Sequence, residues 1–372
     1  MNNTELIITG GFLGSGKTTL LWKTAQHLAS EGKSVGLITN DQAPELVDSA
    51  ILSLSGLRVT EVSGSCFCCN FEGFTKAIER LEGADVILAE PVGSCADLSA
   101  TILQPLKKFL AARLDIAPFT VLADPQRLSS ILEGGNGGLH PDAAYIFRKQ
   151  LEESDIILLT KVDRLDLNDR ERLLGRLASK YPGTTVLPVS AQSEEGIGEW
   201  LTTLRRKRDC GMRILQIDYD RYAHGEAVLG WLNATVRISD KQTDWKDLLR
   251  SIVLELSESF NKENLPVGHL KAIIENGTLF SVANLTGTPT GAGPTDKGKS
   301  ISLRGEAGIS EEAVLILNAR VETTPRHLEE LAESALAKVL GDTYRQEVLA
   351  WKSLQPGRPN PTYRFPEIFR PC

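Results

Sequence analysis

Residues 11–18, GFLGSGKT, restrict the fold of this chain more than any other stretch. They fit G-x-x-x-x-G-K-[ST] at every fixed position, between the strand-like run ELIIT and the amphipathic run TTLLWKTAQHLA. In that setting the glycines let the backbone close around a phosphate chain, and the amide N–H groups at the start of the next helix face the anion. A chance glycine-rich turn is disfavoured because strand, motif and helix come in the required order. The stretch therefore predicts a phosphate-binding loop.

The same loop supplies the charged and hydroxyl groups that a nucleoside triphosphate needs. Lys17 adds a positive charge at the β- and γ-phosphates, and the hydroxyl of Thr18 is placed to ligate Mg²⁺. We expect the nucleotide to be bound here by Gly11, Gly14, Ser15, Gly16, Lys17 and Thr18.

The first 209 residues alternate short apolar runs with amphipathic stretches. Strands that are apolar throughout are covered on both faces, and their alternation with helices is typical of a mainly parallel α/β sheet. With the loop, this predicts a P-loop NTPase fold for residues 1–209. The expected strands are 5–10, 34–39, 57–62, 85–90, 118–124, 155–160 and 185–190, and the expected helices are 17–30, 72–82, 97–113, 141–153, 168–180 and 194–207.

Around Cys210-Gly211 this rhythm changes, and residues 210–345 predict a smaller α+β domain. A ferredoxin-like layout is the expected arrangement. Its expected elements are strands near 212–219, 226–238, 278–285 and 312–321, with helices near 244–262 and 325–340. Residues 346–372 form a proline-rich tail, which we expect to run extended over the surface or to be disordered.

Charge and cysteine content narrow the class of protein. The net charge is −7 without a long basic stripe, so nucleic acid is not the expected main partner. No apolar run approaches the roughly 20 residues of a membrane span, and the first strand begins too early to leave room for a signal peptide. We therefore expect a cytoplasmic protein with no membrane partner, in which clustered thiols are metal ligands or redox centres.

Residues 160–163, TKVD, follow the strand-like run DIILL and resemble the guanine-reading N-K-x-D motif, with Thr160 in the first place. The carboxylate of Asp163 can accept the N1–H and N2–H groups of guanine, a pair that adenine lacks, and Lys161 would lie along the base. Further on, the backbone at Ser190 and Ala191 is placed to meet guanine O6. Alone, a lysine and an aspartate could simply end a strand; the order of the three motifs favours GTP.

Two carboxylates follow other strands at the expected ligand edge of the sheet. Glu90 can hold Mg²⁺ through water or orient the attacking water, and Gly93 lets a backbone N–H approach the γ-phosphate. Such a contact is lost on hydrolysis, so the segment after Gly93 is an expected switch. For Asp41, positioning of water or metal and a plain capping role are both open. For Asp124, capping ranks first.

Three cysteines crowd into GSCFCCN: Cys66, Cys68 and Cys69. Thiolates this close repel one another unless a cation shares them, and Zn²⁺, Cu⁺, Co²⁺ or Ni²⁺ suit sulfur ligands. Because neighbours are hard to aim at one ion, two or three of these thiols plus an outside ligand are expected. A redox pair is the main alternative. Cys95 is the candidate outside ligand, although a small buried cysteine can also just pack a helix start.

The five histidines of the chain are far apart in sequence and form no histidine-rich tract. Each is expected to be an ordinary surface or core residue, so no metal-storing loop is predicted.

The runs GGFLGSGKTTLL, CFCC, EPVG and TKVD, in this order and spacing, resemble the CobW-like GTPases, relatives of the nickel-insertion GTPases of urease and hydrogenase maturation. The resemblance covers about residues 5–205. It implies GTP hydrolysis linked to delivery of a metal or metal cofactor to a client enzyme. Residue by residue, it implies phosphate and Mg²⁺ binding at Gly14, Gly16, Lys17, Thr18 and Thr19, metal binding at Cys66, Cys68 and Cys69, Walker B roles for Glu90 and Gly93, guanine reading by Lys161 and Asp163, and a role for Asp41 in ITNDQ.

The chain also departs from the family pattern. Ala43 and Pro44 replace a usual Gly-Glu pair, and EPVGSCADL differs from the commoner E-x-T-G-x-A-D-P. These departures indicate a divergent branch, with a corrinoid-dependent or other metalloenzyme as client.

The sequence thus predicts a GTP-hydrolysing metallochaperone or maturation factor that uses GTP, Mg²⁺ and a transition metal, Zn²⁺ or Co²⁺ first. Lys17, Asp41 and Glu90 are its expected catalytic residues. The expected partners are GTP or GDP and a client enzyme, with a homodimer as one oligomeric form. The alternatives are a GTP-gated chaperone with structural cysteines and a thiol redox sensor; TKVD disfavours a P-loop kinase.

Overall fold

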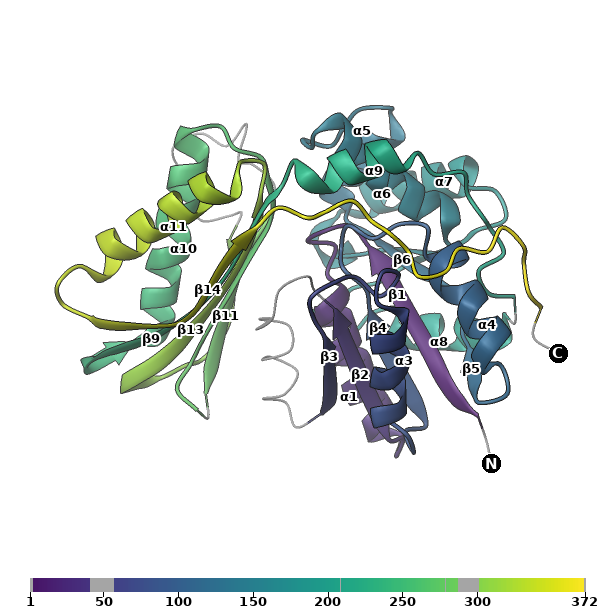
Figure 1. Ribbon diagram of the computed structural model, residues 1–372, viewed down its shortest axis with the longest axis horizontal. Coiled ribbons are helices and arrows are strands. Elements are labelled where there is room, and N and C mark those ends of the chain that lie inside the picture. The colour runs from purple at the N-terminus through teal and green to yellow at the C-terminus, as the bar shows by residue number, and fades with distance from the viewer. Residues whose placement is uncertain (1–2, 41–56, 208, 278, 287–300, 371–372) are drawn as a thin grey trace.

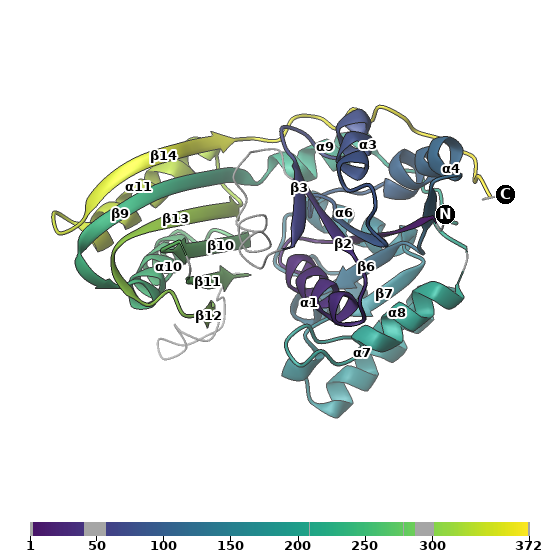
Figure 2. The same ribbon diagram turned by 90° about the horizontal axis from the view of Figure 1, so that it is seen from below.

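The computed structural model describes residues 3–40, 57–207, 209–277, 279–286 and 301–370. They form two domains that lie side by side (Figures 1 and 2). Among these residues, no helix combines the length and the apolar character that crossing a membrane requires.

The first domain is built on a parallel sheet, as the alternation of apolar strands and helices predicts. The strand order is β3-β2-β4-β1-β6-β7-β8, and β5 pairs with β1. All of these pairings are parallel. The strands are β1 (Thr4–Gly11), β2 (Val35–Asn40), β3 (Arg58–Val62), β4 (Val86–Glu90), β5 (Leu114–Ile116), β6 (Thr120–Ala123), β7 (Ile156–Leu159) and β8 (Thr185–Pro188).

Helices cover both faces of this sheet and bury it between two apolar clusters. In β1, Leu6 and Ile8 belong to one cluster and Ile7 to the other, because successive side chains of a strand point to opposite faces. The helices are α1 (Lys17–Ser30), α3 (Phe71–Arg80), the π-helical turn η1 (Ser99–Leu103), α4 (Gln104–Leu110), α5 (Pro125–Leu132), α6 (Pro141–Glu153), the short 3₁₀ turn η2 (Val162–Arg164), α7 (Leu167–Lys180) and α8 (Ile197–Arg206).

Two details of the first domain differ from the sequence prediction. The expected helix 97–113 consists of η1 and α4 and ends at Leu110, and the short strand β5, which was not expected, follows it. Helix α5 was not expected, yet its start is well specified: Asp124 accepts a hydrogen bond from Gln126 N at 2.9 Å, and Pro125 fills the first helical position. The capping role that ranked first for Asp124 is therefore confirmed.

The second domain is a six-stranded antiparallel sheet of order β12-β11-β10-β13-β9-β14. Strands β14-β9-β13-β10, with α10 and α11 as crossovers, follow the order of a βαββαβ ferredoxin-like unit, and the β11–β12 hairpin widens it. A separate apolar core lies between this sheet and its two helices. The elements are β9 (Gly230–Asp244), α10 (Trp245–Lys262), β10 (Val267–Glu275), β11 (Phe280–Leu285), β12 (Ile301–Gly305), β13 (Ile309–Val321), α11 (Pro325–Leu340) and β14 (Arg345–Leu354).

The expected strand at 212–219 is wrong. Its end becomes helix α9 (Tyr219–Ala227), since Asp218 caps that helix by accepting hydrogen bonds from the backbone N–H groups of Asp220 and Arg221. The start of the segment is held against the first domain, where Asp155 accepts from Gly211 N at 2.6 Å. Helix α9 thus connects the two domains.

The tail begins later than expected. Residues 345–354 form β14, which pairs with β9, so the second sheet extends past the predicted limit at residue 345. From residue 355 the chain runs extended back over the first domain (Figure 1). There Thr362 N donates to Cys68 O at 2.8 Å and Phe365 N to Ala100 O at 3.0 Å.

Candidate functional site

The phosphate loop joins β1 to α1 and has the backbone geometry that its glycines allow. Gly11, Gly14 and Gly16 all have positive φ angles, of 133°, 78° and 98°, which favour glycine. A Cβ added at Gly16 would meet no heavy atom within 4 Å, so space is open beside the loop. Lys17 Nζ donates to Gly11 O at 2.8 Å and lies 3.8 Å from Glu90 Oε1.

A hydroxyl–carboxylate pair lies next to this lysine. Thr18 Oγ1 donates to Glu90 Oε2 at 2.8 Å, which brings together two oxygen ligands that Mg²⁺ prefers. Gly93, three residues beyond Glu90, packs on the loop: an added Cβ there would lie 3.1 Å from Lys17 Nζ and 3.2 Å from Leu13 N. The residues present therefore fit a Mg²⁺-bound phosphate chain.

The TKVD segment contacts the phosphate loop directly. Thr160 Oγ1 donates to Ser15 O at 3.0 Å, so threonine still braces the two loops where the family pattern has asparagine. Lys161 Nζ donates to Gly14 O at 2.9 Å and to Asp124 Oδ2 at 2.5 Å.

Asp163 and Ser190 meet at the far end of the site. Ser190 Oγ donates to Asp163 Oδ1 at 2.6 Å and accepts from the backbone of Gln192 and Ser193, both at 3.2 Å. One carboxylate oxygen of Asp163 is thereby fixed by the second loop. Thr19 and Ala191 line the same pocket, and Asp41 lies outside the described residues.

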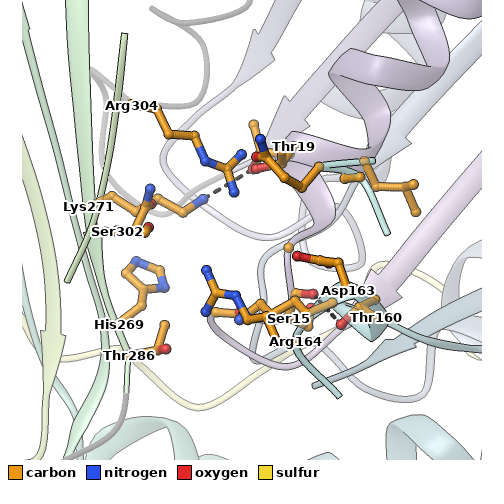
Figure 3. A pocket seen from close by; sticks show the side chains of 18 of the residues that line it. Ser15, Thr19, Thr160, Asp163, Arg164, His269, Lys271, Thr286, Ser302 and Arg304 are labelled. Carbon is orange, nitrogen blue, oxygen red and sulfur yellow. Dashed lines mark hydrogen bonds between the residues drawn. The ribbon is translucent and has the colours of Figure 1, made fainter. Parts of the chain in front are cut away.

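The pocket has a cavity volume of about 100 Å³, and residues of the second domain line one side of it, which the sequence did not predict (Figure 3). Lys271 Nζ, on β10, donates to Thr18 Oγ1 at 3.1 Å. Arg304, on β12, faces Thr19 across the pocket. The second-domain residues that line the pocket are His269, Leu270, Lys271, Asn284, Thr286, Ser302 and Arg304.

His269 adds a buried polar group to this face. Its Nδ1 atom is buried and has no hydrogen-bond partner among the described residues. Burial, reinforced by the nearby cations Lys271 and Arg320, holds the pKa of His269 well below its usual value. A neutral imidazole amid these cations fits a site that receives an anion.

The cysteine cluster lies at the turn between β3 and α3. Its three sulfur atoms lie within 4.8 Å of one another, with Cys66 Sγ 3.0 Å from Cys68 Sγ and Cys68 Sγ 3.8 Å from Cys69 Sγ. The tight turn, in which Cys69 N donates to Cys66 O at 3.0 Å, brings even the neighbours Cys68 and Cys69 to one side. The expected obstacle of aiming adjacent thiols at one ion is therefore absent here.

The thiols share protons in a way that suits metal binding. Hydrogen bonds from Cys68, Cys69 and Cys95 hold the pKa of Cys66 well below its usual value. The hydrogen bond to Cys66 raises the pKa of Cys69 to about 11 and also raises those of Cys68 and Cys95. A group of hydrogen-bonded thiols, one of them with a lowered pKa, is a ligand set whose protons a soft or borderline cation can replace.

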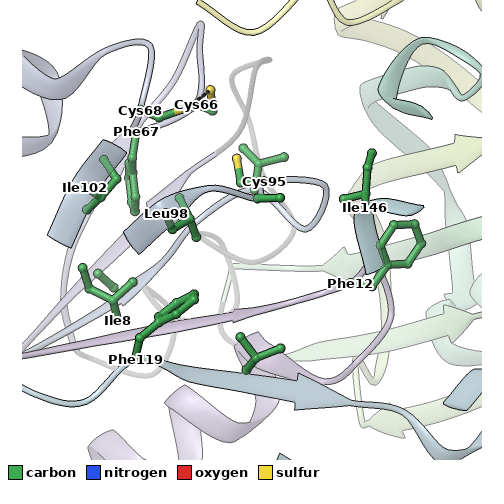
Figure 4. Close-up of a cluster of buried hydrophobic side chains, with 14 of the residues drawn as sticks. Ile8, Phe12, Cys66, Phe67, Cys68, Cys95, Leu98, Ile102, Phe119 and Ile146 are labelled. Atoms are coloured by element: carbon green, nitrogen blue, oxygen red, sulfur yellow. Dashed lines mark hydrogen bonds between the residues drawn. The ribbon is translucent and has the colours of Figure 1, made fainter. Parts of the chain in front are cut away.

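Cys95 is buried, and its sulfur faces those of Cys66 and Cys68 (Figure 4). Its segment is held by Gln150, whose Nε2 donates to Gly93 O at 3.0 Å and to Cys95 O at 2.7 Å. One short segment, 93–95, therefore contacts the phosphate-loop lysine at one end and the cysteine cluster at the other.

Two further groups around the cluster, Asn40 and Glu226, were not among the site residues predicted from the sequence. Asn40, at the end of β2, donates from Nδ2 to Val62 O and Ser65 O and accepts from Phe67 N, which fixes the cysteine turn. Glu226 of α9 accepts from Ser94 Oγ at 2.5 Å, and burial raises its pKa well above the usual value.

The tail covers the outer side of the cluster. Asn360 N donates to Cys69 Sγ at 3.2 Å, and Thr362 Oγ1 donates to Cys69 O at 3.2 Å. Arg364 Nε lies 2.7 Å from Asp97 Oδ2, and Asp97 is two residues after Cys95.

Comparison with known proteins adds a family match. Residues 5–188 match the family described as CobW/HypB/UreG, nucleotide-binding domain. The hydrogenase maturation factor HypB of Azotobacter chroococcum is 30% identical over 207 residues, 54% of this chain and 59% of that protein. The zinc chaperone CobW of Pseudomonas aeruginosa is 24% identical over 220 residues, 50% of this chain and 56% of that protein. The matches thus span little more than half the length of these relatives.

Among solved structures, the zinc-bound YjiA GTPase from E. coli aligns with 91% of this chain and 99% of its own, with a TM-score of 0.38 and 16% sequence identity.

Proposed function

The nucleotide-binding domain of this chain, residues 5–188, belongs to the CobW/HypB/UreG family, and on that premise we propose that the protein is a GTPase that binds a transition metal ion and delivers it to a client enzyme. The metal is cargo, held by Cys66, Cys68, Cys69 and Cys95. The client is a metalloenzyme or a protein that carries a metal cofactor, and the expected compartment is the cytoplasm.

Segment 93–95 is the observation that carries this proposal. Gly93 packs against Lys17, and Cys95, two residues on, faces Cys66 and Cys68. A change at the γ-phosphate that moves Gly93 would therefore also move the thiol of Cys95 in the proposed metal site. This arrangement supports a coupling between nucleotide state and metal affinity.

The catalytic proposal rests on positioning and charge. Mg²⁺ would be held by Thr18 and Glu90 and would neutralise charge that develops on the phosphates. Lys17 stabilises the same charge, and the carboxylate of Glu90 orients water near the phosphate chain. Asp163 and Lys161 select guanine, with Ser190 fixing the carboxylate.

Zinc affinity measured in two nucleotide states tests the proposal. With Mg²⁺ and a non-hydrolysable GTP analogue, the Zn²⁺ dissociation constant should differ from that with GDP by about 5- to 150-fold, the usual range of coupling between two sites. Competition with a chromophoric chelator measures both constants. Equal dissociation constants in the two nucleotide states would contradict the coupling. The absence of zinc binding altogether would contradict the proposal that the metal ion is cargo.

Lys271 gives a second expected outcome, from the second domain. Replacing it with glutamine removes a positive charge that lies 3.1 Å from the Thr18 hydroxyl. A phosphate chain bound at the loop would bring its oxygens within reach of this ammonium group. Because a hydrogen bond from a charged donor contributes roughly 1.5–3 kcal/mol, the affinity for Mg²⁺-GTP should fall by about tenfold or more in the variant. Fluorescent nucleotide titration measures this change.

The matched control for Lys271→Gln is Lys262→Gln, an exposed lysine at the end of α10 in the same domain. It should leave nucleotide affinity unchanged. An equal loss in both variants would mean that general charge, and not contact with the phosphate site, is responsible.

A further inference from the structure

A second cluster of metal-ligating side chains lies on the surface, away from the cysteines. His140 precedes α6, Asp142 is in its first turn, and His224 is near the end of α9. One potential ligand atom from each residue lies within 4.8 Å of the others. The two imidazole rings are 5.0 Å apart, edge to face.

The contacts within this cluster resemble those around a metal ligand. His224 Nδ1 lies 2.7 Å from Asp142 Oδ2, so the carboxylate orients that ring. His140 Nδ1 accepts from Asp142 N at a long 3.2 Å, a weak bond that a stronger partner can replace. The side chain of His224 is 58% exposed, so an ion can enter directly from solvent.

The charges around the cluster have both signs. Arg221 Nε lies 2.9 Å from Asp142 Oδ1, which opposes a cation there but leaves Oδ2 on the side of His224. Glu322 interacts with His140 and adds a second carboxylate nearby. Two imidazoles and a carboxylate suit borderline divalent ions such as Zn²⁺, Co²⁺ and Ni²⁺, and three protein ligands leave a position for water or an incoming ligand.

We propose that His140, Asp142 and His224 form a second, solvent-accessible site for a borderline divalent metal ion. The position of helix α9 connects this proposed site to the segment that contains Cys95. The same helix carries Tyr222, whose hydroxyl accepts from Ala96 N at 3.1 Å, and Glu226, which contacts Ser94. The proposed site is therefore on the helix that contacts both sequence neighbours of Cys95. There it would hold a metal ion that exchanges with solvent, outside the buried thiols.

Zinc stoichiometry tests the site in the two-domain chain of 372 residues without its cluster thiols. In a Cys66→Ser/Cys68→Ser/Cys69→Ser/Cys95→Ser protein, competition with a chromophoric chelator should reveal one remaining equivalent of Zn²⁺ bound in the micromolar range. Adding His140→Gln and His224→Gln should abolish it. No remaining equivalent, or one that survives the two histidine changes, would overturn the proposal.

His327→Gln is the matched control, since His327 also pairs with a carboxylate, that of Glu263 at 2.5 Å, but outside such a cluster. The protein with His327→Gln should still bind this one equivalent of Zn²⁺. If the protein without the four cluster thiols does not fold, the His140→Gln/His224→Gln change is made in the otherwise unaltered chain. There the total zinc bound should fall by one equivalent, and an unchanged total would refute the second site. Because GTP affinity is measured separately, loss of this site is distinguishable from failure of the GTPase proposal.

Discussion

Replacement of Asp163 by asparagine should lower the affinity for GTP by about 100-fold or more and create a preference for xanthosine triphosphate, XTP. The reason is a change of hydrogen-bonding character: the carboxylate accepts from guanine N1–H and N2–H, whereas an amide presents a donor, which suits the xanthine carbonyl. Two hydrogen bonds to a charged acceptor contribute roughly 3 kcal/mol or more, which corresponds to this change in affinity. Ser190 still holds the first oxygen, so the loop should keep its shape.

Competition between GTP and XTP for a fluorescent nucleotide measures this switch. Asp166→Asn is the control, because Asp166 lies three residues on and only caps α7, a role that asparagine fills equally well. If the Asp163→Asn protein still prefers GTP to XTP, the assignment of Asp163 as the guanine reader is wrong.

A Cys66→Ser/Cys68→Ser protein should lose more than about 100-fold in zinc affinity, since changes to groups that merely support metal ligands already cost 10- to 100-fold. The 3.0 Å approach of these two sulfurs makes them the closest pair of the cluster. GTP binding should remain, because the phosphate loop is contacted by Gly93 and not by these thiols. Zinc and nucleotide titrations on one preparation separate the two effects.

Cys210→Ser is the control for this pair. Cys210 is also buried and also a free thiol, but it lies outside the cluster. Its replacement should leave zinc affinity unaltered. Retention of tight zinc binding by the Cys66→Ser/Cys68→Ser protein would favour a structural or redox role for the cysteines.

The parts of the site that the sequence predicted are local ones. The phosphate loop, TKVD and CFCC each lie within a few consecutive residues, and a parallel sheet brings the ends of its strands to one edge whatever the helices between them do. The functional groups of these motifs are therefore set by a few consecutive residues, and their chemistry can be predicted from the sequence alone.

The second-domain half of the pocket could not be predicted in this way. Lys271 lies in PVGHLKAIIE, which was not expected to be a strand, and it reaches Thr18 only because β10 packs beside the phosphate loop. The same holds for His140 and His224, which are remote in sequence and meet only because α6 and α9 pack together. The tail was expected to be extended, but its contact with Cys69 is made by a backbone N–H, which no side-chain pattern can reveal.

The second domain is tethered to the first at two points, by α9 where the chain enters it and by residues 355–370 where it leaves. Between these two connections, Arg127 of the first domain donates to Val267 O of β10 at 2.7 Å and also holds the domains together. Both connecting segments contact the surroundings of the cysteine cluster, through Glu226 on Ser94 and Asn360 on Cys69. A movement of the second domain that opens the nucleotide pocket would therefore disturb two contacts beside the thiols, one at Ser94 next to Cys95 and one at Cys69.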